Sequence, residues 1–146
     1  MGLAEVVADA AGRQAVVASC VRLVEEQVDS KRGLSGAALK AGYAAFKRVR
    51  PGMVAFAVDK LLPEFAAAID PHWAQGVAAG DPDGWFRSHQ RPIAQDLLAV
   101  TDRIAGRSHN RVLVKLYQSL RGSAVDHVAE AVPRLAPLIR THTAAR

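Results

Sequence analysis

The sequence QAVVASCVRLVEEQVDSKRGLSGAALK, residues 14–40, decides the fold class of this chain. Its first part carries four valines at the three- and four-residue intervals that place side chains on one face of an α-helix: Val17, Val21, Val24 and Val28. The run Lys31-Arg32-Gly33 predicts the end of this helix, because cations suit the negative end of the helix dipole and glycine suits a left-handed cap. Ser35 then offers an N-cap for a second helix, which we expect to run to about Arg50.

Helix signals continue beyond this stretch. Pro51 suits the first position of a third helix, and Pro63 is expected to kink or end it. Two Asp-Pro pairs follow, at residues 70–71 and 81–82. Each pair combines a capping carboxylate with a proline at the first helical position, so each predicts the start of a short helix.

The last third of the chain predicts two longer helices and a short one. Pro92 is expected to begin one long helix, and Asn110 is expected to cap the next. Residues 122–123, Gly-Ser, predict an interruption. A short final helix should follow, with a frayed end at residues 141–146. Two prolines are expected to punctuate that helix: Pro133 and Pro137.

These signals together predict an all-α fold. Strand-like alternation never extends beyond three or four residues, and no heptad repeat persists. We therefore expect residues 1–146 to form a single domain, a compact irregular bundle of about six to eight helices, several of them short.

Composition excludes several classes of protein. The chain has 146 residues, half of them apolar and 23% charged, which is the balance of a globular domain. A single cysteine, Cys20, excludes a disulfide scaffold, and no apolar run is long enough to span a membrane. Since the first residues lack a basic, then apolar, signal segment, we expect a cytoplasmic protein.

The net charge of +5 is unevenly distributed along the chain. Residues 31–60 carry seven basic and one acidic side chain, and residues 101–146 carry eight and three. The intervening residues 61–100, like residues 1–30, carry two basic and five acidic side chains. Either the basic helices lie beside the acidic ones and neutralise them, or the two basic segments share a face that attracts an anion.

The first candidate site is the glycine-bearing turn that begins at Lys31. Free backbone N–H groups at a helix start, with cations on both sides, favour binding of a phosphate or carboxylate. The spacing of Gly33 and Gly36 excludes a Walker A loop, and an ordinary joint between two helices explains the same residues. The candidate residues for binding an anion or a partner are Lys31, Arg32, Ser35, Gly36, Lys40 and Lys47.

The same stretch has the apolar and glycine spacing of a DNA-binding helix-turn-helix. A recognition helix needs side chains that reach base edges, such as arginine or asparagine. Here the front of the second helix offers Gly36, Ala37 and Ala38. Nucleic-acid binding is therefore the disfavoured alternative, and it would depend mainly on contacts from lysine and arginine to phosphates.

A second basic group lies near residue 110. Its members are spaced four residues apart in pairs, so each pair shares a helix face and repels slightly. Such pairs indicate an acidic helix of the same chain or an external anion, although a solvated charged face has the same pattern. The group comprises Arg103, Arg107, Arg111 and Lys115.

Catalytic and metal-binding patterns are weak in this sequence. His127 and Glu130 form one i, i+3 pair, whereas a di-iron bundle needs two such pairs and further carboxylates. Ser123, Asp126 and His127 contain the residue types of a triad, but adjacency in sequence is not geometry. We expect neither a metal nor another cofactor, and we favour a protein that is not an enzyme.

Four stretches of the chain resemble a known family: residues 31–43, KRGLSGAALKAGY; residues 49–73, from VRPGM to DPHW; residues 96–102, DLLAVTD; and residues 115–122, KLYQSLRG. The family comprises small, uncharacterised, largely actinobacterial proteins that form a domain of unknown function. The resemblance implies a compact all-helical domain and transfers no catalytic residue.

From these observations we expect a non-enzymatic binding or interaction module. Its partner would be an acidic protein or a phosphate-bearing ligand, bound through the basic helix start around residues 31–50. Two alternatives remain open at this point. One is DNA binding through phosphate contacts, and the other is a purely structural helical homo-oligomer.

Overall fold

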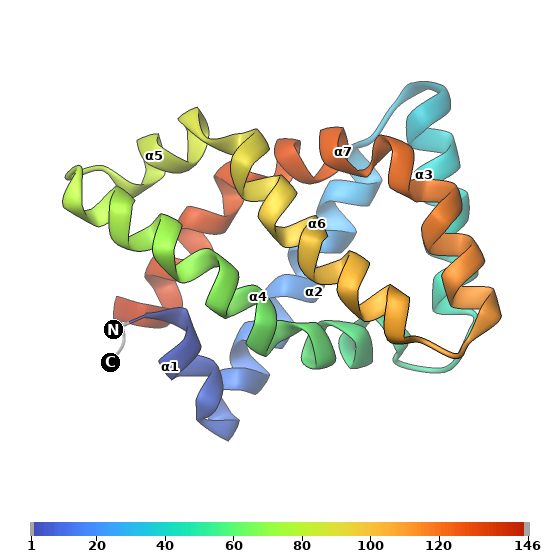
Figure 1. The fold of residues 1–146 in the computed structure, drawn as a ribbon, viewed down its shortest axis with the longest axis horizontal. Helices are drawn as coiled ribbons and strands as arrows, with labels where there is room; N and C mark the ends of the chain where they lie inside the picture. Colours follow the sequence, from blue (N-terminus) through green and yellow to red (C-terminus); the bar gives the residue numbers. More distant parts are fainter. Residues whose placement is uncertain (1, 145–146) are drawn as a thin grey trace.

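A computed structural model describes residues 2–144, and within that range the chain is all-helical, without strands. The predicted all-α bundle of six to eight helices is therefore confirmed (Figure 1). The described residues form seven helices: α1 (Leu3–Ala8), α2 (Ala10–Ser30), α3 (Gly33–Lys47), α4 (Met53–Ala78), α5 (Pro82–Ser88), α6 (Gln90–Arg107) and α7 (Arg111–Ala144).

The tightly packed core lies where α1, α2, α4, α5 and α6 meet the second half of α7. Its largest fully buried side chains come from five helices: Val6, Val16, Phe86, Ile93, Val100, Val132 and Ile139. The short helix α5 is fixed there by Phe86, whose ring meets the edge of Trp73 with 5.9 Å between ring centroids. Burying large apolar side chains in this way is the main source of stability for helices too short to persist alone.

The joint between α2 and α3 differs from the prediction at one residue. The helix α2 ends at Ser30 and Gly33 adopts a left-handed φ of +75°, as the sequence predicted for this turn. Ser35, however, is not an N-cap. Helix α3 begins at Gly33 after Arg32, which makes no side-chain cap, and the Ser35 hydroxyl instead contacts His127 Nε2 at 2.8 Å.

Pro63 does not end α4, and Pro71 lies inside this helix, not at the start of a new one as predicted. The helix runs without a break from Met53 to Ala78 through Pro63 and Pro71. Asp70 was expected to cap a helix starting at residue 71, but its carboxylate caps α1: it accepts from Leu3 N at 2.8 Å and from Ala4 N at 3.1 Å. Packing of α4 against α1, α2, α5 and α6 offsets the backbone hydrogen bonds that the prolines remove.

The start of α5 is formed as predicted. Asp81 accepts a hydrogen bond from Gly84 N at 3.0 Å, and Pro82 occupies the first turn. Gly80 precedes them with a left-handed φ of +82°, which ends α4. Helix α6 begins at Gln90, two residues before the predicted start at Pro92.

Helix α7 is one continuous helix, where the sequence predicted an interruption and a short last helix. The predicted N-cap of α7 is confirmed, since Asn110 Oδ1 accepts a hydrogen bond from Leu113 N at 3.1 Å. The helix then continues through residues 122–123 and through Pro133 and Pro137. The part expected to fray is helical as far as Ala144, and residues 145–146 lie outside the described range.

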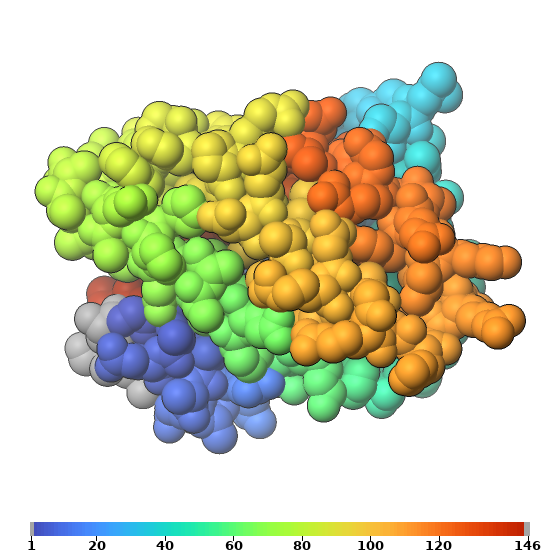
Figure 2. Space-filling model, in the orientation of Figure 1, coloured from blue at the N-terminus to red at the C-terminus, as the bar shows by residue number. Residues whose placement is uncertain are grey.

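The end of the bundle built from α3 and the first half of α7 is packed less tightly than the core. In α3 only two glycines, Gly36 and Gly42, are buried, and the buried residues of α7 begin at Ala129. In the view of Figure 2 the first turns of α7, in orange, project from this end of the molecule. The looser packing leaves the hollows that form the candidate site.

Candidate ligand-binding site

Lys31, the first predicted anion-binding residue, is turned into the protein. Its side chain is only 6% exposed, and its ammonium is paired with the carboxylate of Glu130 in α7. A buried ammonium with a carboxylate partner is already neutralised by its own chain. Lys31 therefore connects α2 to α7.

The neighbours of Lys31 build the same joint. The Arg32 guanidinium donates to the carbonyls of Asp29 at 3.1 Å and Lys31 at 3.2 Å. Gly36 lies so close to Lys31 that an added Cβ would be 2.8 Å from the Lys31 carbonyl carbon. With the Ser35–His127 contact, these residues form a joint between helices, which is the structural interpretation of the motif.

The last two residues of the first group lie farther along α3, away from this joint. Lys40 and Lys47 are both exposed on α3, and Lys47 Nζ lies 4.8 Å from the centre of the Tyr43 ring. Within residues 2–144, neither forms an ion pair with a carboxylate. The predicted set of six therefore divides into four residues at the α2–α3 joint, of which Lys31 and Gly36 are buried, and two exposed lysines farther along α3.

The second basic group divides as well. Arg103 and Arg107 of α6 both pair with Glu64 of α4, at 3.6 Å and 3.1 Å. Arg111 and Lys115, one turn apart at the start of α7, have no carboxylate partner among the described residues. The acidic segments thus neutralise the α6 half of this group and leave the α7 half free.

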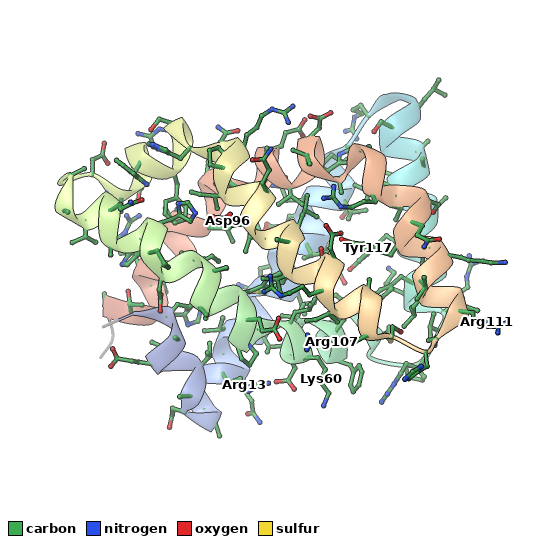
Figure 3. All side chains as sticks on the ribbon, in the orientation of Figure 1. Arg13, Lys60, Asp96, Arg107, Arg111 and Tyr117 are labelled. Atoms are coloured by element: carbon green, nitrogen blue, oxygen red, sulfur yellow. The ribbon has the colours of Figure 1, made fainter. Side chains whose placement is uncertain are left out.

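Arg111 and Lys115 line an open hollow of about 520 Å³ at the turn between α6 and α7. The other lining residues are Ser108, His109, Val114 and Gln118, so no carboxylate of residues 2–144 borders this hollow. Figure 3 shows Arg111 at the outer end of the molecule, away from the core. The hollow also lies at the N-terminus of a 34-residue helix, where the helix dipole favours an anion.

An apolar pocket of about 290 Å³ adjoins this hollow and shares Ser108 and Val114 with it. Four helices contribute to its walls: Phe46 from α3; Met53, Phe56 and Leu61 from α4; Ile104 from α6; and Leu113 and Tyr117 from α7. A second apolar hollow of about 180 Å³, between α3 and α7, continues from it and shares Phe46, Leu113 and Tyr117.

Cations also border the apolar pocket. Lys60 lines it, and its ammonium lies 5.4 Å from the centre of the Phe56 ring. The guanidinium of Arg50 lies 4.3 Å from the same ring. Cation–π contacts of this kind hold both side chains beside the pocket without neutralising their charge.

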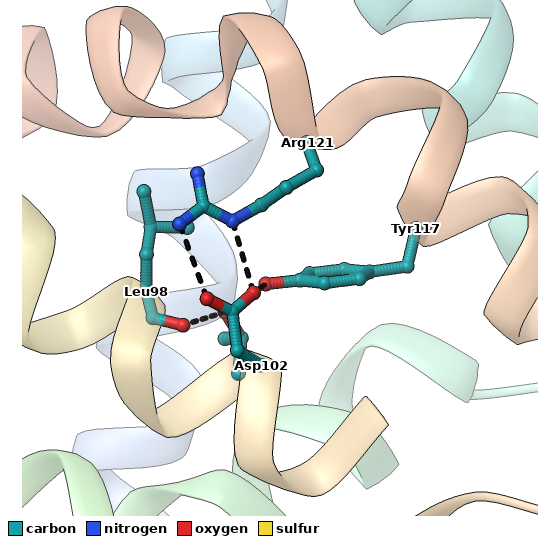
Figure 4. A network of polar contacts seen from close by, with 5 residues as sticks. Leu98, Asp102, Tyr117 and Arg121 are labelled. Carbon is teal, nitrogen blue, oxygen red and sulfur yellow. Dashed lines mark hydrogen bonds and ion pairs between the residues drawn. The ribbon is translucent and has the colours of Figure 1, made fainter. Parts of the chain in front are cut away.

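A polar network fixes one wall of the pocket (Figure 4). The Tyr117 hydroxyl donates to Asp102 and contacts Thr101 Oγ1 at 2.6 Å, and Arg121 binds the same carboxylate at 2.9 Å. The Arg121 guanidinium, with help from Tyr117, holds the pKa of the Asp102 carboxyl below its usual range. Burial and the hydrogen bond to Asp102 raise the pKa of Tyr117, so its hydroxyl stays protonated at neutral pH. The network holds the Tyr117 ring between the two apolar hollows.

One signal in the sequence could have located this site. Residues 30–58 and 103–125 contain neither aspartate nor glutamate, although they carry eleven lysines and arginines. The first stretch forms α3 and the start of α4, and the second forms the end of α6 and the first half of α7. Because residues of both stretches line the same pocket, two acid-free segments far apart in sequence meet at one end of the fold.

The described residues do not assemble the triad that the sequence suggested. Asp126 pairs with Arg91 at 2.5 Å, and the Ser123 hydroxyl donates to Leu120 O at 3.4 Å. Burial raises the pKa of the Cys20 thiol to about 11, which keeps it protonated and poorly nucleophilic. No group of three metal-binding side chains occurs within residues 2–144.

Among the described helices, none combines the length and apolarity required to cross a membrane. A family model described as a family of unknown function (DUF6918) matches residues 3–143, almost the whole chain. The comparisons with curated proteins and with solved structures gave no match.

Proposed function

Since the chain belongs to DUF6918, a family of unknown function, we propose from its geometry that it is a non-enzymatic binding module for an anionic ligand. The ligand binds at the end of the bundle formed by α3 and the first half of α7. The observation that carries this proposal is the pair Arg111 and Lys115, which lines a hollow without a carboxylate beside an apolar pocket.

The charge arrangement favours an anion at this position. Arg111 and Lys115 lie at i, i+4 on one helix face, so in the absence of an anion the two charges repel each other. They also stand in the first two turns of α7, where the helix dipole is positive. A bound phosphate or carboxylate relieves both unfavourable interactions.

The proposed basic surface extends from this hollow to neighbouring helices. Exposed cations without a carboxylate partner in the described range continue along α3, the turn after it and the start of α4: Lys40, Lys47, Arg48, Arg50 and Lys60. This surface replaces the location around Lys31 that the sequence suggested, because Lys31 is buried and paired with Glu130.

The test is reversal of the two charges in the hollow. We expect the double variant Arg111→Glu, Lys115→Glu to elute from a heparin column at clearly lower salt than the wild type. The matched control is Arg22→Glu, Arg87→Glu, which makes the same change in net charge at two exposed arginines outside this surface. Equal losses in the two double variants would show that only net charge matters and would refute the site.

Two alternatives give different results. DNA binding predicts a gel shift of duplex DNA, but α3 presents Leu34, 92% exposed, and two alanines where a recognition helix needs base-reading side chains. We therefore expect no shift at physiological salt. A structural oligomer predicts a multimer in light scattering, whereas we expect the mass of a monomer.

A further inference from the structure

We infer that the ligand is a single-chain anionic amphiphile, whose hydrocarbon tail fills the apolar pocket and whose charged head lies between Arg111 and Lys115. This inference rests on the proposed function and specifies its ligand. It follows from the junction of two cavities of opposite character, one apolar and one cationic, that share Ser108 and Val114.

The apolar pocket has the size and lining for a hydrocarbon chain. Its walls are almost entirely aliphatic and aromatic, and ligand pockets in proteins begin at about 300 Å³. An apolar cavity of about 150 Å³ holds benzene, which has six carbon atoms. At that ratio the 290 Å³ pocket admits about twelve carbon atoms, and the 180 Å³ hollow beyond Tyr117 extends it further.

The polar groups in the wall do not require a polar ligand atom. The hydroxyls of Thr101 and Tyr117 contact each other at 2.6 Å, and Tyr117 also donates to Asp102. The single proton of the Thr101 hydroxyl goes either to Tyr117 or to Leu98 O, which lies 2.9 Å from Thr101 Oγ1. Because these groups already have partners, nothing in this wall attracts a charged head into the pocket.

The cations that would bind the charged head of the ligand lie at the exit from the apolar pocket. A chain that leaves the pocket past Ser108 and Val114 emerges in the hollow lined by Arg111 and Lys115. The described residues lining the two cavities include no carboxylate that would repel an anionic head. Tail and head of one small molecule therefore find complementary surroundings on adjacent walls.

A second copy of the chain is a poorer occupant of the same pocket. In a twofold-symmetric pair the same patch of each copy would meet, so the cations Arg111, Lys115 and Lys60 would face a surface that carries the same three cations. Such like-charge contacts oppose association. A neutral hydrocarbon would fill the pocket but would leave the repulsion between Arg111 and Lys115 unchanged.

The first experiment uses the wild-type chain and a series of free amphiphiles below their micelle concentrations. Isothermal titration of octanoate, decanoate and dodecanoate should show affinity rising about fourfold for each added methylene. Decan-1-ol, with the same number of carbon atoms as decanoate and no charge, should bind at least about tenfold more weakly. Nonyl phosphate, which has the same nine-carbon alkyl chain as decanoate, then decides whether the preferred head is a phosphate monoester or a carboxylate.

Two variants localise the tail. Ala57 lines the pocket, whereas Ala55 is exposed on the same helix and does not line it. Ala57→Phe should abolish the dependence of affinity on chain length, and Ala55→Phe should preserve it. If Ala57→Phe fails to fold, Ala105→Leu from the α6 wall is the replacement, because it fills the pocket with a smaller side chain.

The outcomes separate this inference from the proposed function. If charge reversal at Arg111 and Lys115 weakens heparin binding but affinity in the wild type does not depend on chain length, the amphiphile is refuted and the anion site stands. If decan-1-ol binds as tightly as decanoate and charge reversal has no effect, the anion site is refuted. Binding to anionic vesicles without binding to free amphiphiles would also overturn the inference, because it would indicate a membrane surface.

Discussion

The ion pair Lys31–Glu130 provides the sharpest test of how the joint between α2 and α3 is held against α7. The substitution Glu130→Gln removes the negative charge but keeps the shape of the side chain and nearly the same helix propensity. It leaves the Lys31 ammonium, 6% exposed, without its carboxylate partner. The measured change in stability therefore reports the loss of that charge.

The expected magnitude lies between two limits. Breaking a fully buried ion pair by removing one partner costs about 3–5 kcal/mol, whereas an exposed pair contributes about 0–1 kcal/mol. Lys31 is buried but Glu130 is 65% exposed, so water screens one side of the pair. We expect Glu130→Gln to lower the free energy of unfolding by about 2 kcal/mol.

The assay is urea unfolding followed by far-ultraviolet circular dichroism at neutral pH, with the slope of the transition compared between variants. The matched control is Glu26→Gln, which breaks the pair between Glu26 and Arg134, where both side chains are about half exposed. That control should cost no more than about 0.5 kcal/mol. Lys31→Met, which removes the buried charge and keeps the length of the side chain, should be nearly neutral.

The double variant completes the cycle. In the Lys31→Met background, Glu130→Gln should cost almost nothing, because no buried ammonium remains to be left unpaired. The reasoning is refuted if Glu130→Gln costs no more than Glu26→Gln, or if Lys31→Met is as destabilising as the loss of Glu130. Either result would mean that the lysine does not depend on this carboxylate.

Three further predictions concern the fold. Gly36→Ala should lower the free energy of unfolding by about 1 kcal/mol although alanine has the better helix propensity, because its Cβ meets the Lys31 backbone. Gly42→Ala should be neutral or stabilising in the same urea assay, because its Cβ meets only the flexible side chain of Leu120. Asp70→Ala should lower the free energy of unfolding by about 1–2 kcal/mol, because both hydrogen bonds that cap α1 are lost. Amide hydrogen exchange should become faster in α1 alone, and an equal increase in all helices would contradict this prediction. Burial lowers the pKa of His142 below its usual value of 6.5. The stability that the neutral imidazole contributes to the fold is therefore complete above pH 6.5 and declines as the pH falls below it. His142→Gln should flatten the fall in Tm between pH 7 and pH 5.

Local signals in the sequence predicted several helix ends correctly. Asp81-Pro82 and Asn110 cap the helices that they were expected to cap, and Gly33 and Gly80 adopt left-handed conformations at the turns. These signals are reliable because a cap or a left-handed glycine acts within four or five residues. The all-α class follows equally directly from the spacing of the apolar residues.

The prolines and Asp70 show where local reasoning fails. Proline removes one backbone hydrogen bond from a helix, and the sequence alone cannot show whether packing offsets that loss. In α7 the buried residues Val132, Ala136 and Ile139 continue one stripe across both prolines, so the helix persists. Asp70 looked like a cap for its own helix, yet it caps α1, which lies 66 residues earlier in the chain.

For the candidate site, the sequence by itself determined the residue types and the uneven charge, including the cations at 31–50 and 103–115. Only the tertiary structure decided which of these charges are neutralised. Glu130 and Glu64 reach Lys31 and the α6 arginines from distant parts of the chain, while Arg111 and Lys115 are left beside a pocket built by four helices. The physical reason is that charge pairing and cavities depend on distances across the fold, whereas composition and periodicity record only neighbours along the chain.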